Sequence, residues 1–226
     1  MEAIVLAGGL GTRLAHVVPD VPKAMAPVAG RPFLEYVLAD LSKGGVGHAV
    51  LAVGYKKECI MEHFGRSFMG IRIDYSIEET ALLTGGAIKQ ALAGCGEDAV
   101  FALNGDTLFH VPLEAMAREH KKSGAQLSVA VKELLDFDRY GTVRFDPDGW
   151  ITGFEEKKPR KQGYINGGVY RIDSGLLQSY PDVFSFERRV LEEGVHRCRM
   201  RAFPADGYFI DIGVPEDYAR AQRELS

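Results

Sequence analysis

Residues 3–14 read AIVLAGGLGTRL, an apolar run that passes directly into a glycine-rich loop. The apolar run Ala3–Ala7 predicts a buried strand. Glycines placed directly after a first strand let backbone N–H groups approach phosphate closely. Arg13 lies inside the loop, and its guanidinium fork can hold phosphate oxygens through two hydrogen bonds. We therefore expect a phosphate-binding loop at residues 8–14.

Two familiar phosphate-binding loops do not fit this stretch. A dinucleotide fingerprint would continue from Gly9 and Gly11 to a third glycine, but position 14 is Leu14. That fingerprint also needs an acidic residue at the end of the second strand, and Val53 is followed by Gly54-Tyr55-Lys56. A Walker A loop would need Gly-Lys-Ser/Thr, which is missing. The loop therefore belongs to neither class, and the alternative to a phosphate-binding loop is a glycine turn with an exposed arginine.

The first half of the chain alternates short apolar runs with amphipathic segments, which predicts parallel strands with helices on both faces. The predicted strands are 49–53, 71–77 and 99–103; the predicted helices are 32–43, 57–64 and 84–92. Pro32 suits a first helical position and Thr84 a helix N-cap. In such sheets ligands lie beyond the carboxyl ends of the strands. The segments after Ala7, Ile77 and Leu103 should therefore share one crevice.

From Gln126 onward the pattern changes to short strand-like runs separated by turn residues. We expect strands at 127–131, 142–145, 151–155 and 164–172, and helices at 186–193 and 216–225. This pattern indicates a mixed or antiparallel region that forms one wall of a pocket. The chain contains no internal repeat and no linker, so a single domain over residues 1–226 is expected.

Composition limits the class of partner. Lys and Arg number 27 and Asp and Glu number 31, which gives a formal charge of −4. A weakly acidic chain argues against a nucleic-acid partner or a membrane-surface partner. Cys59, Cys95 and Cys198 are scattered and odd in number, which is typical of reduced thiols. With no signal peptide and no long apolar run, a cytoplasmic location is expected.

The loop GGLGTRL at residues 8–14, followed by Val21-Pro22-Lys23, resembles the signature of the sugar-1-phosphate nucleotidyltransferases. That family joins a nucleoside triphosphate (NTP) to a sugar 1-phosphate, releases pyrophosphate and uses Mg²⁺. The resemblance implies an α/β fold: a Rossmann-like mixed, mainly parallel sheet flanked by helices, with a smaller sugar-binding β subregion. It also implies that residues 1–125 mainly bind the nucleotide and residues 126–226 mainly bind the sugar phosphate.

The resemblance assigns roles to the nucleotide half of the chain. Arg13 and Lys23 match catalytic positions that neutralise phosphate charge, and Asp106 and Asp211 match the carboxylates that hold Mg²⁺. The implied nucleotide-binding residues are Leu6, Ala7, Gly8, Gly9, Gly11, Thr12, Arg13, Thr84, Gly85, Asn104 and Gly105.

The resemblance also implies a site for the sugar phosphate. Glu156 and Asn166 would orient the sugar hydroxyls, and Lys157 would bind the sugar's phosphate. Gly141 would offer a backbone contact, and Gly167 would allow close approach of the ligand.

Within the family, residues 137–143, 161–168 and 208–218 are similar to the D-glycero-α-D-manno-heptose 1-phosphate guanylyltransferases. That group makes GDP-heptose from GTP for bacterial capsule, S-layer or lipopolysaccharide sugars. Three alternatives stay open: a mannose-1-phosphate guanylyltransferase, a hexose-1-phosphate thymidylyl- or uridylyltransferase, and an inactive sugar-nucleotide-binding regulator. A regulator would be expected to lose Arg13, Lys23 or a metal aspartate, and all are present. The partners expected are therefore small-molecule substrates, and a homodimer is an open possibility.

Overall fold

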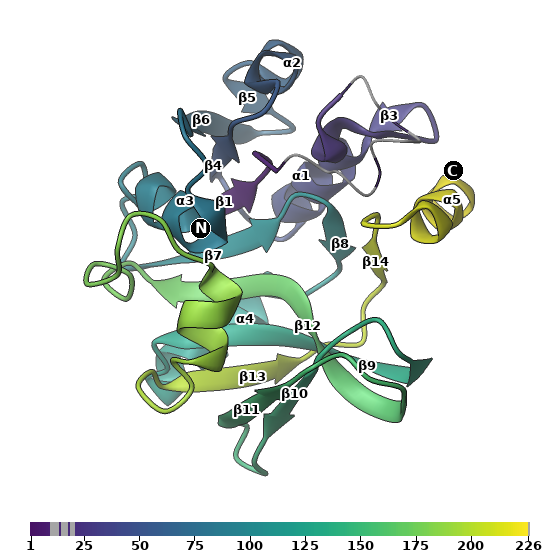
Figure 1. Ribbon diagram of the computed structural model, residues 1–226. Coiled ribbons are helices and arrows are strands. Elements are labelled where there is room, and N and C mark those ends of the chain that lie inside the picture. Colours follow the sequence, from purple (N-terminus) through teal and green to yellow (C-terminus); the bar gives the residue numbers. More distant parts are fainter. Residues whose placement is uncertain (10–13, 15–17, 19–20, 226) are drawn as a thin grey trace.

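The computed structural model describes residues 1–9, 14, 18 and 21–225, and a ten-stranded mixed sheet runs through it (Figure 1). The strands of its main path, in spatial order, are β11 (Ile151–Glu155), β10 (Thr142–Phe145), β12 (Arg160–Asp173), β7 (Ala99–Asn104), β1 (Glu2–Leu6), β4 (His48–Val53), β6 (Ile71–Ile77) and β5 (Ser67–Phe68). Off this path, β9 (Leu127–Phe137) pairs with β12, and β13 (Met200–Pro204) pairs with β9.

The parallel part of the sheet is formed by β7, β1, β4 and β6. Val5 of β1 lies opposite Leu51 on one side and Leu103 on the other. Every residue of β4 is buried. Such continuous apolar strands are typical of parallel sheets that are covered on both faces. The predicted α/β class, with its mainly parallel sheet, is confirmed.

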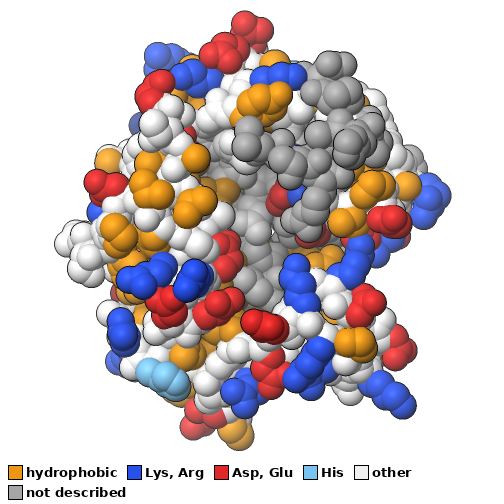
Figure 2. Space-filling view, viewed as in Figure 1, with side chains coloured by type: hydrophobic (Ala, Val, Ile, Leu, Met, Phe, Trp, Pro, Cys, Tyr) orange, Lys and Arg blue, Asp and Glu red, His pale blue; other side chains and the backbone are white. Residues whose placement is uncertain are grey.

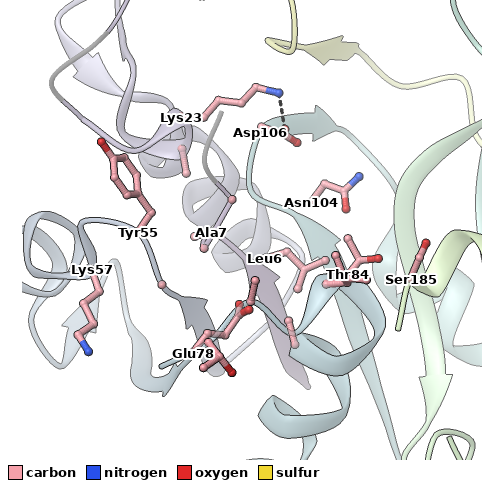
Figure 3. Close-up of a pocket in the computed structure, with 18 of the residues that line it drawn as sticks. Leu6, Ala7, Lys23, Tyr55, Lys57, Glu78, Thr84, Asn104, Asp106 and Ser185 are labelled. Atoms are coloured by element: carbon pink, nitrogen blue, oxygen red, sulfur yellow. Dashed lines mark hydrogen bonds and ion pairs between the residues drawn. The ribbon is translucent and has the colours of Figure 1, made fainter. Parts of the chain in front are cut away.

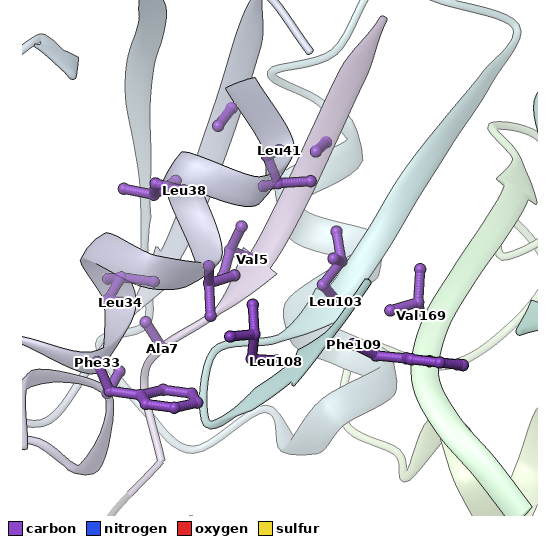
Figure 4. Packing of buried hydrophobic residues seen from close by; sticks show 14 of the residues in the cluster. Val5, Ala7, Phe33, Leu34, Leu38, Leu41, Leu103, Leu108, Phe109 and Val169 are labelled. Carbon is purple, nitrogen blue, oxygen red and sulfur yellow. The ribbon is translucent and has the colours of Figure 1, made fainter. Parts of the chain in front are cut away.

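Helices cover both faces of the sheet. They are α1 (Phe33–Lys43), α2 (Lys57–Phe64), α3 (Leu83–Leu92), α4 (Leu113–Ser123) and α5 (Pro215–Glu224), with a 3₁₀ turn η1 (Lys23–Met25) and a π-helical turn η2 (Glu187–Glu192). Leu38 of α1 belongs to the core cluster that contains Val5, shown in Figure 4. Ile88 of α3 belongs to the cluster on the other face, with Ile4. Neighbouring residues of β1 thus point into separate cores, as strand alternation requires.

The second half of the chain continues the same sheet. β12 runs antiparallel to β7, with Val169 opposite Leu103. The register between β12 and β9 shifts between Asn166 and Tyr170, and Gly168 has a φ of +71° at this bulge. The expected mixed region is therefore present, and it is hydrogen-bonded directly to the parallel strands.

The position of Pro32 and the presence of helix α4 differ from the sequence-based expectations. Pro32 precedes α1 in a short strand, β3 (Arg31–Pro32), which pairs with β2 (Pro27–Val28), so it does not occupy the first helical position. The helix α4 was not predicted, because its buried stripe includes a polar residue, His120, which interrupts the apolar periodicity. His120 is satisfied there by Ser128 Oγ at 2.9 Å and Asp173 Oδ1 at 3.0 Å.

Among the described residues, no helix has the length and apolar character needed to span a membrane. On the face shown in Figure 2, acidic and basic side chains are interspersed. This mixture agrees with the small net charge of −4. The described side chains of that face form no extended basic patch for a polyanion.

Candidate active site

A cavity of about 910 Å³ opens at the carboxyl ends of β1, β4, β6 and β7 (Figure 3). The residues that line it are Leu6, Ala7, Gly8, Gly9, Lys23, Ala24, Gly54, Tyr55, Lys57, Glu78, Glu79, Thr80, Ala81, Leu83, Thr84, Ala87, Asn104, Asp106, Ser185, Glu187 and Gly213. The segments that follow Ala7, Ile77 and Leu103 all contribute, so the predicted shared crevice is confirmed.

Three charged residues from distant parts of the chain meet at one side of this cavity. Asp106 follows β7. Asp211 ends β14 (Phe209–Asp211), which pairs with β8 (Thr107–Phe109) so that Asp211 lies opposite Thr107. Lys23, on η1, forms ion pairs with both carboxylates, at 3.8 Å from its Nζ to Asp211 Oδ1.

Asp106 and Asp211 carry two negative charges, and the described residues that form ion pairs with them supply one positive charge, on Lys23. Burial raises the pKa of Asp211, and the neighbouring Asp106 charge raises it further. The Lys23 ammonium and the Gly213 N–H, which donates to Asp211 Oδ1 at 2.7 Å, act in the opposite direction. Among the described residues, one ammonium for two carboxylates leaves a deficit of positive charge that a divalent cation would remove.

The donor set itself limits which cation fits. Nowhere in residues 1–9, 14, 18 and 21–225 do three or more His, Cys, Asp or Glu residues cluster as metal ligands. Asp106 and Asp211 provide only carboxylate oxygens. Mg²⁺ typically takes one or two protein carboxylates and completes its shell with phosphate oxygens and water. The pair therefore fits Mg²⁺ better than a cation that needs a full protein cage.

Six of the predicted nucleotide-binding residues line the cavity: Leu6, Ala7, Gly8, Gly9, Thr84 and Asn104. At Gly8 a Cβ atom would lie 2.8 Å from Glu78 Oε1, so this position has little room for a side chain. The predicted residues Gly11, Thr12 and Arg13 lie outside the described residues.

Gly85 and Gly105 are not among the described residues that line the cavity. The Gly85 N–H donates to the Phe184 carbonyl at 2.9 Å, and a Cβ would overlap the Phe184 ring at 2.2 Å. The Gly105 N–H donates to the Leu6 carbonyl at 2.9 Å, and a Cβ would lie 2.6 Å from that oxygen. Both glycines allow close backbone packing behind the cavity wall.

The prediction that Thr84 caps α3 is wrong. The helix begins at Leu83, and Leu82 occupies the cap position without a side-chain hydrogen bond. The Thr84 hydroxyl instead donates to Glu187 Oε2 at 2.6 Å and accepts from the Phe186 N–H at 3.0 Å. The Thr84 hydroxyl therefore bonds to residues distant in sequence and does not cap its own helix.

The five predicted sugar-phosphate residues do not occur among the described residues that line this cavity. Asn166 donates from Nδ2 to the Tyr170 hydroxyl at 2.7 Å and accepts from the Gly168 N–H at 3.0 Å. Glu156 and Lys157 are exposed, just beyond the end of β11.

The two glycines of this group pack against protein atoms. A Cβ at Gly167 would lie 2.3 Å from the Phe109 ring, and one at Gly141 would lie 2.6 Å from the Glu155 carbonyl oxygen. Protein atoms therefore occupy the space beside Gly141 and Gly167 on the side where a Cβ would lie.

The match to known proteins covers the chain. Residues 2–226 match the family model described as nucleotidyl transferase. The chain belongs to the nucleotidyl transferase family.

Two curated relatives of this nucleotidyl transferase carry the name D-glycero-alpha-D-manno-heptose 1-phosphate guanylyltransferase. The protein from Aneurinibacillus thermoaerophilus is 45% identical over 227 residues, which cover 100% of this chain and 98% of the relative. The protein from Campylobacter jejuni is 46% identical over 220 residues, which cover 96% of this chain and 97% of the relative.

Solved structures agree with the fold of this nucleotidyl transferase. HddC from Yersinia pseudotuberculosis, complexed with GMP-PN, superposes with a TM-score of 0.90 at 33% identity, covering 100% of this chain and 99% of HddC. A putative glucose-1-phosphate thymidylyltransferase from Bacillus anthracis has a TM-score of 0.83 at 21% identity and supports the fold alone.

Several cavity-lining residues of this nucleotidyl transferase were absent from the sequence-based set, among them Glu78, Ser185 and Glu187. Glu78 directly follows β6, so the rule that ligands lie beyond the carboxyl ends of parallel strands could have identified it. Ser185 and Glu187 reach the cavity through tertiary packing against α3, and no local sequence signal marks them.

Proposed function

We propose that this chain is a D-glycero-α-D-manno-heptose 1-phosphate guanylyltransferase that makes GDP-heptose and pyrophosphate from GTP and the sugar 1-phosphate. The observation that carries the proposal is the 45% and 46% identity to two proteins of that name, over 96% or more of both partners. Mannose-1-phosphate guanylyltransferase from Mycobacterium tuberculosis is 32% identical, and the match covers 64% of that protein.

The chemistry proposed is a single displacement at phosphorus. An anionic oxygen of the sugar 1-phosphate attacks the α-phosphorus of GTP and forms the new P–O bond. The bond from the α-phosphorus to the oxygen that bridges to the β-phosphate breaks, and pyrophosphate leaves with that electron pair. Because the attacking oxygen is already an anion at neutral pH, the reaction needs positioning and charge neutralisation more than a general base.

The residues of the cavity supply that neutralisation in this proposal. Lys23 brings an ammonium group to the Asp106 side of the cavity, where it can bind phosphate oxygens. Asp106 and Asp211 would hold Mg²⁺, which supplies charge neutralisation at the phosphate oxygens when bound. Arg13, outside the described residues, is proposed to bind the departing phosphates. Asn104 lines the same side and offers both a donor and an acceptor.

The division of the chain is also part of the proposal. Residues 1–125 would mainly bind the nucleotide, and residues 126–226 would mainly bind the sugar phosphate through Gly141, Glu156, Lys157, Asn166 and Gly167. Because these five residues do not line the cavity as it stands, the proposal requires that the sugar phosphate binds beside it. A cytoplasmic location is proposed because the three cysteines are free, as a reducing compartment keeps them.

The test is pyrophosphate release across a grid of GTP, ATP, UTP and dTTP against the 1-phosphates of D-glycero-α-D-manno-heptose, mannose and glucose, with Mg²⁺ or with EDTA. The proposal expects Mg²⁺-dependent turnover with GTP and the heptose phosphate. Preference for GTP with mannose 1-phosphate would support the guanylyltransferase chemistry and overturn the heptose assignment. No turnover, with the folded protein binding a nucleotide sugar, would overturn the enzyme assignment in favour of a regulator. Light scattering of the same sample would measure whether the protein is a homodimer.

A further inference from the structure

The wall of the cavity beside the amino end of α3 is built from three polar residues. Thr84 comes from α3, Ser185 from the loop before η2, and Glu187 from η2 itself. The Thr84 and Ser185 hydroxyls both donate to Glu187 Oε2, at 2.6 and 2.9 Å. In Figure 3, Thr84 and Ser185 lie on the side of the cavity away from Tyr55 and Lys57. Two hydroxyls thus hold one carboxylate in a fixed orientation at this wall.

Glu187 is a carboxylate without a cation. It forms no ion pair with any described residue, whereas Glu79 of the same cavity pairs with Lys57 at 3.2 Å. Both hydrogen bonds reach Oε2, and no described residue hydrogen-bonds to Oε1, which is available to accept others. A negative charge in a cavity that binds polyphosphates is repulsive unless it faces a neutral part of the ligand rich in hydrogen-bond donors.

The surroundings of Glu187 indicate which neutral part of the ligand this carboxylate would face. Phe186, its chain neighbour, packs edge-on against Tyr170 with ring centroids 5.0 Å apart. The Tyr170 hydroxyl accepts the hydrogen bond from Asn166, and burial together with the Glu187 charge raises the pKa of Tyr170. Glu187 is therefore next to the group that contains Asn166, a predicted sugar-binding residue, and belongs to the half of the chain proposed to bind the sugar.

We propose that Glu187 is a sugar-binding residue whose Oε1 accepts hydrogen bonds from hydroxyl groups of the sugar 1-phosphate, with Thr84 and Ser185 holding the carboxylate in place. The proposal rests on the proposed function, because it assumes that the cavity takes a nucleotide and a sugar phosphate. Hydroxyl groups are donors without charge, so they match a fixed carboxylate that has no cation.

The test is Glu187→Gln, which keeps an acceptor for both hydroxyls but removes the charge. We expect KM for the sugar 1-phosphate to rise about 10-fold or more, because a hydrogen bond to a charged acceptor is roughly twice as strong as a neutral one. KM for GTP should stay within about 2-fold of wild type, since the charge acts only on the sugar. The matched control is Glu192→Gln, an exposed carboxylate on the same turn, for which both KM values should be those of wild type.

The measurements distinguish failure of the proposed function from failure of the proposed role of Glu187. If wild type uses another sugar 1-phosphate, the heptose assignment fails and Glu187 is tested with the sugar that is used. If wild type shows no turnover, calorimetric binding replaces kinetics. Glu187→Gln should then weaken GDP-mannose binding about 10-fold and leave GDP binding unchanged. An unchanged KM for the sugar phosphate, equal rises in both KM values, or equal losses for GDP-mannose and GDP would overturn the role of Glu187.

Discussion

Lys23 forms ion pairs with two carboxylates that are distant in sequence and are brought together by the pairing of β14 with β8. Asp106 is placed by the end of β7, and Asp211 is placed by the pairing of β14 with β8. Burial and the Asp106 charge both raise the pKa of Asp211, so the charged form of Asp211 is costly without a cation. The role of Lys23, Asp106 and Asp211 therefore depends on the balance of positive and negative charge among these three side chains.

Replacing Asp106 with alanine tests that balance. We expect Asp106→Ala to lower kcat by about 10²-fold or more, because one of two carboxylates for the cation is lost. The melting temperature should stay close to that of wild type, because Asp106 is half-buried and its side chain pairs with the polar groups of Lys23 and Thr107. Glu114→Ala, which removes an exposed carboxylate on α4, is the control and should keep wild-type turnover. Near-wild-type turnover of Asp106→Ala with Mg²⁺ would contradict the assignment.

Two of the three cysteines should be unreactive in the folded protein. Burial raises the pKa of Cys95 and of Cys198 to about 12. Since the thiolate is the reactive form, only about one thiol in ten thousand is ionised at pH 8. Alkylation by iodoacetamide, followed by mass spectrometry, should be slow at both sites and rise about 10-fold per pH unit up to pH 10. Both sites should react quickly in urea; fast labelling of native protein at pH 8 would contradict the expectation.

At the scale of elements, the contact between α3 and the segment before η2 closes one wall of the cavity. The N–H groups of Gly85 and Gly86 both donate to the Phe184 carbonyl, at 2.9 and 3.3 Å. Lys89 of the same helix donates to the Tyr180 carbonyl at 2.6 Å. This approach of one backbone to another is possible only because side chains are missing at positions 85 and 86.

Gly86→Ala tests how close that approach is. A Cβ at Gly86 would lie 2.1 Å from the Asp182 carbonyl oxygen, a backbone atom that cannot rotate away. We expect a loss of about 1–3 kcal/mol in the free energy of unfolding, measured by urea denaturation. The control is Gly96→Ala, where no atom lies within 4 Å of the new Cβ. It should be neutral or stabilising by up to about 1 kcal/mol. Equal stabilities for the two variants would contradict this account.

At the scale of the whole molecule, the nucleotide half and the sugar half share one sheet. β7 of the first half pairs with β12 of the second half, from Leu103 opposite Val169 to Ala99 opposite Asp173. The core cluster that contains Ile4 also contains Tyr170 and Phe186. Residues of both halves therefore lose their burial together if either half unfolds.

We accordingly expect the two halves to unfold in one cooperative step. Trp150, the single tryptophan, lies in the second half and packs against Arg199 at 5.0 Å, so its fluorescence reports on that half. Far-UV circular dichroism is dominated by helices, of which α1, α2, α3 and α4 lie in the first half. The urea midpoints from the two signals should coincide. Two separate midpoints would show that the halves are independent domains.

The sequence alone predicted the parallel part of the fold well. β1, β4, β6 and β7 are short apolar runs between turn residues, and α1 and α2 show clear periodicity, so local pattern and final structure agree. Short motifs that resemble a known family also singled out Lys23, Asp106 and Asp211, which the structure brings together. Such motifs can be recognised in a sequence because they consist of residues that are adjacent along the chain.

Other features were decided only by the tertiary structure. The position of β12 between β10 and β7, the pairing of β14 with β8, and the exchange of the Thr84 cap for a bond to Glu187 all join segments distant in sequence. The buried His120 of α4 is stable only because Ser128 and Asp173 satisfy it. A sequence pattern records which residues favour burial or turns. It does not record which distant partner satisfies a buried polar group, because that depends on the free energy of the whole packed chain.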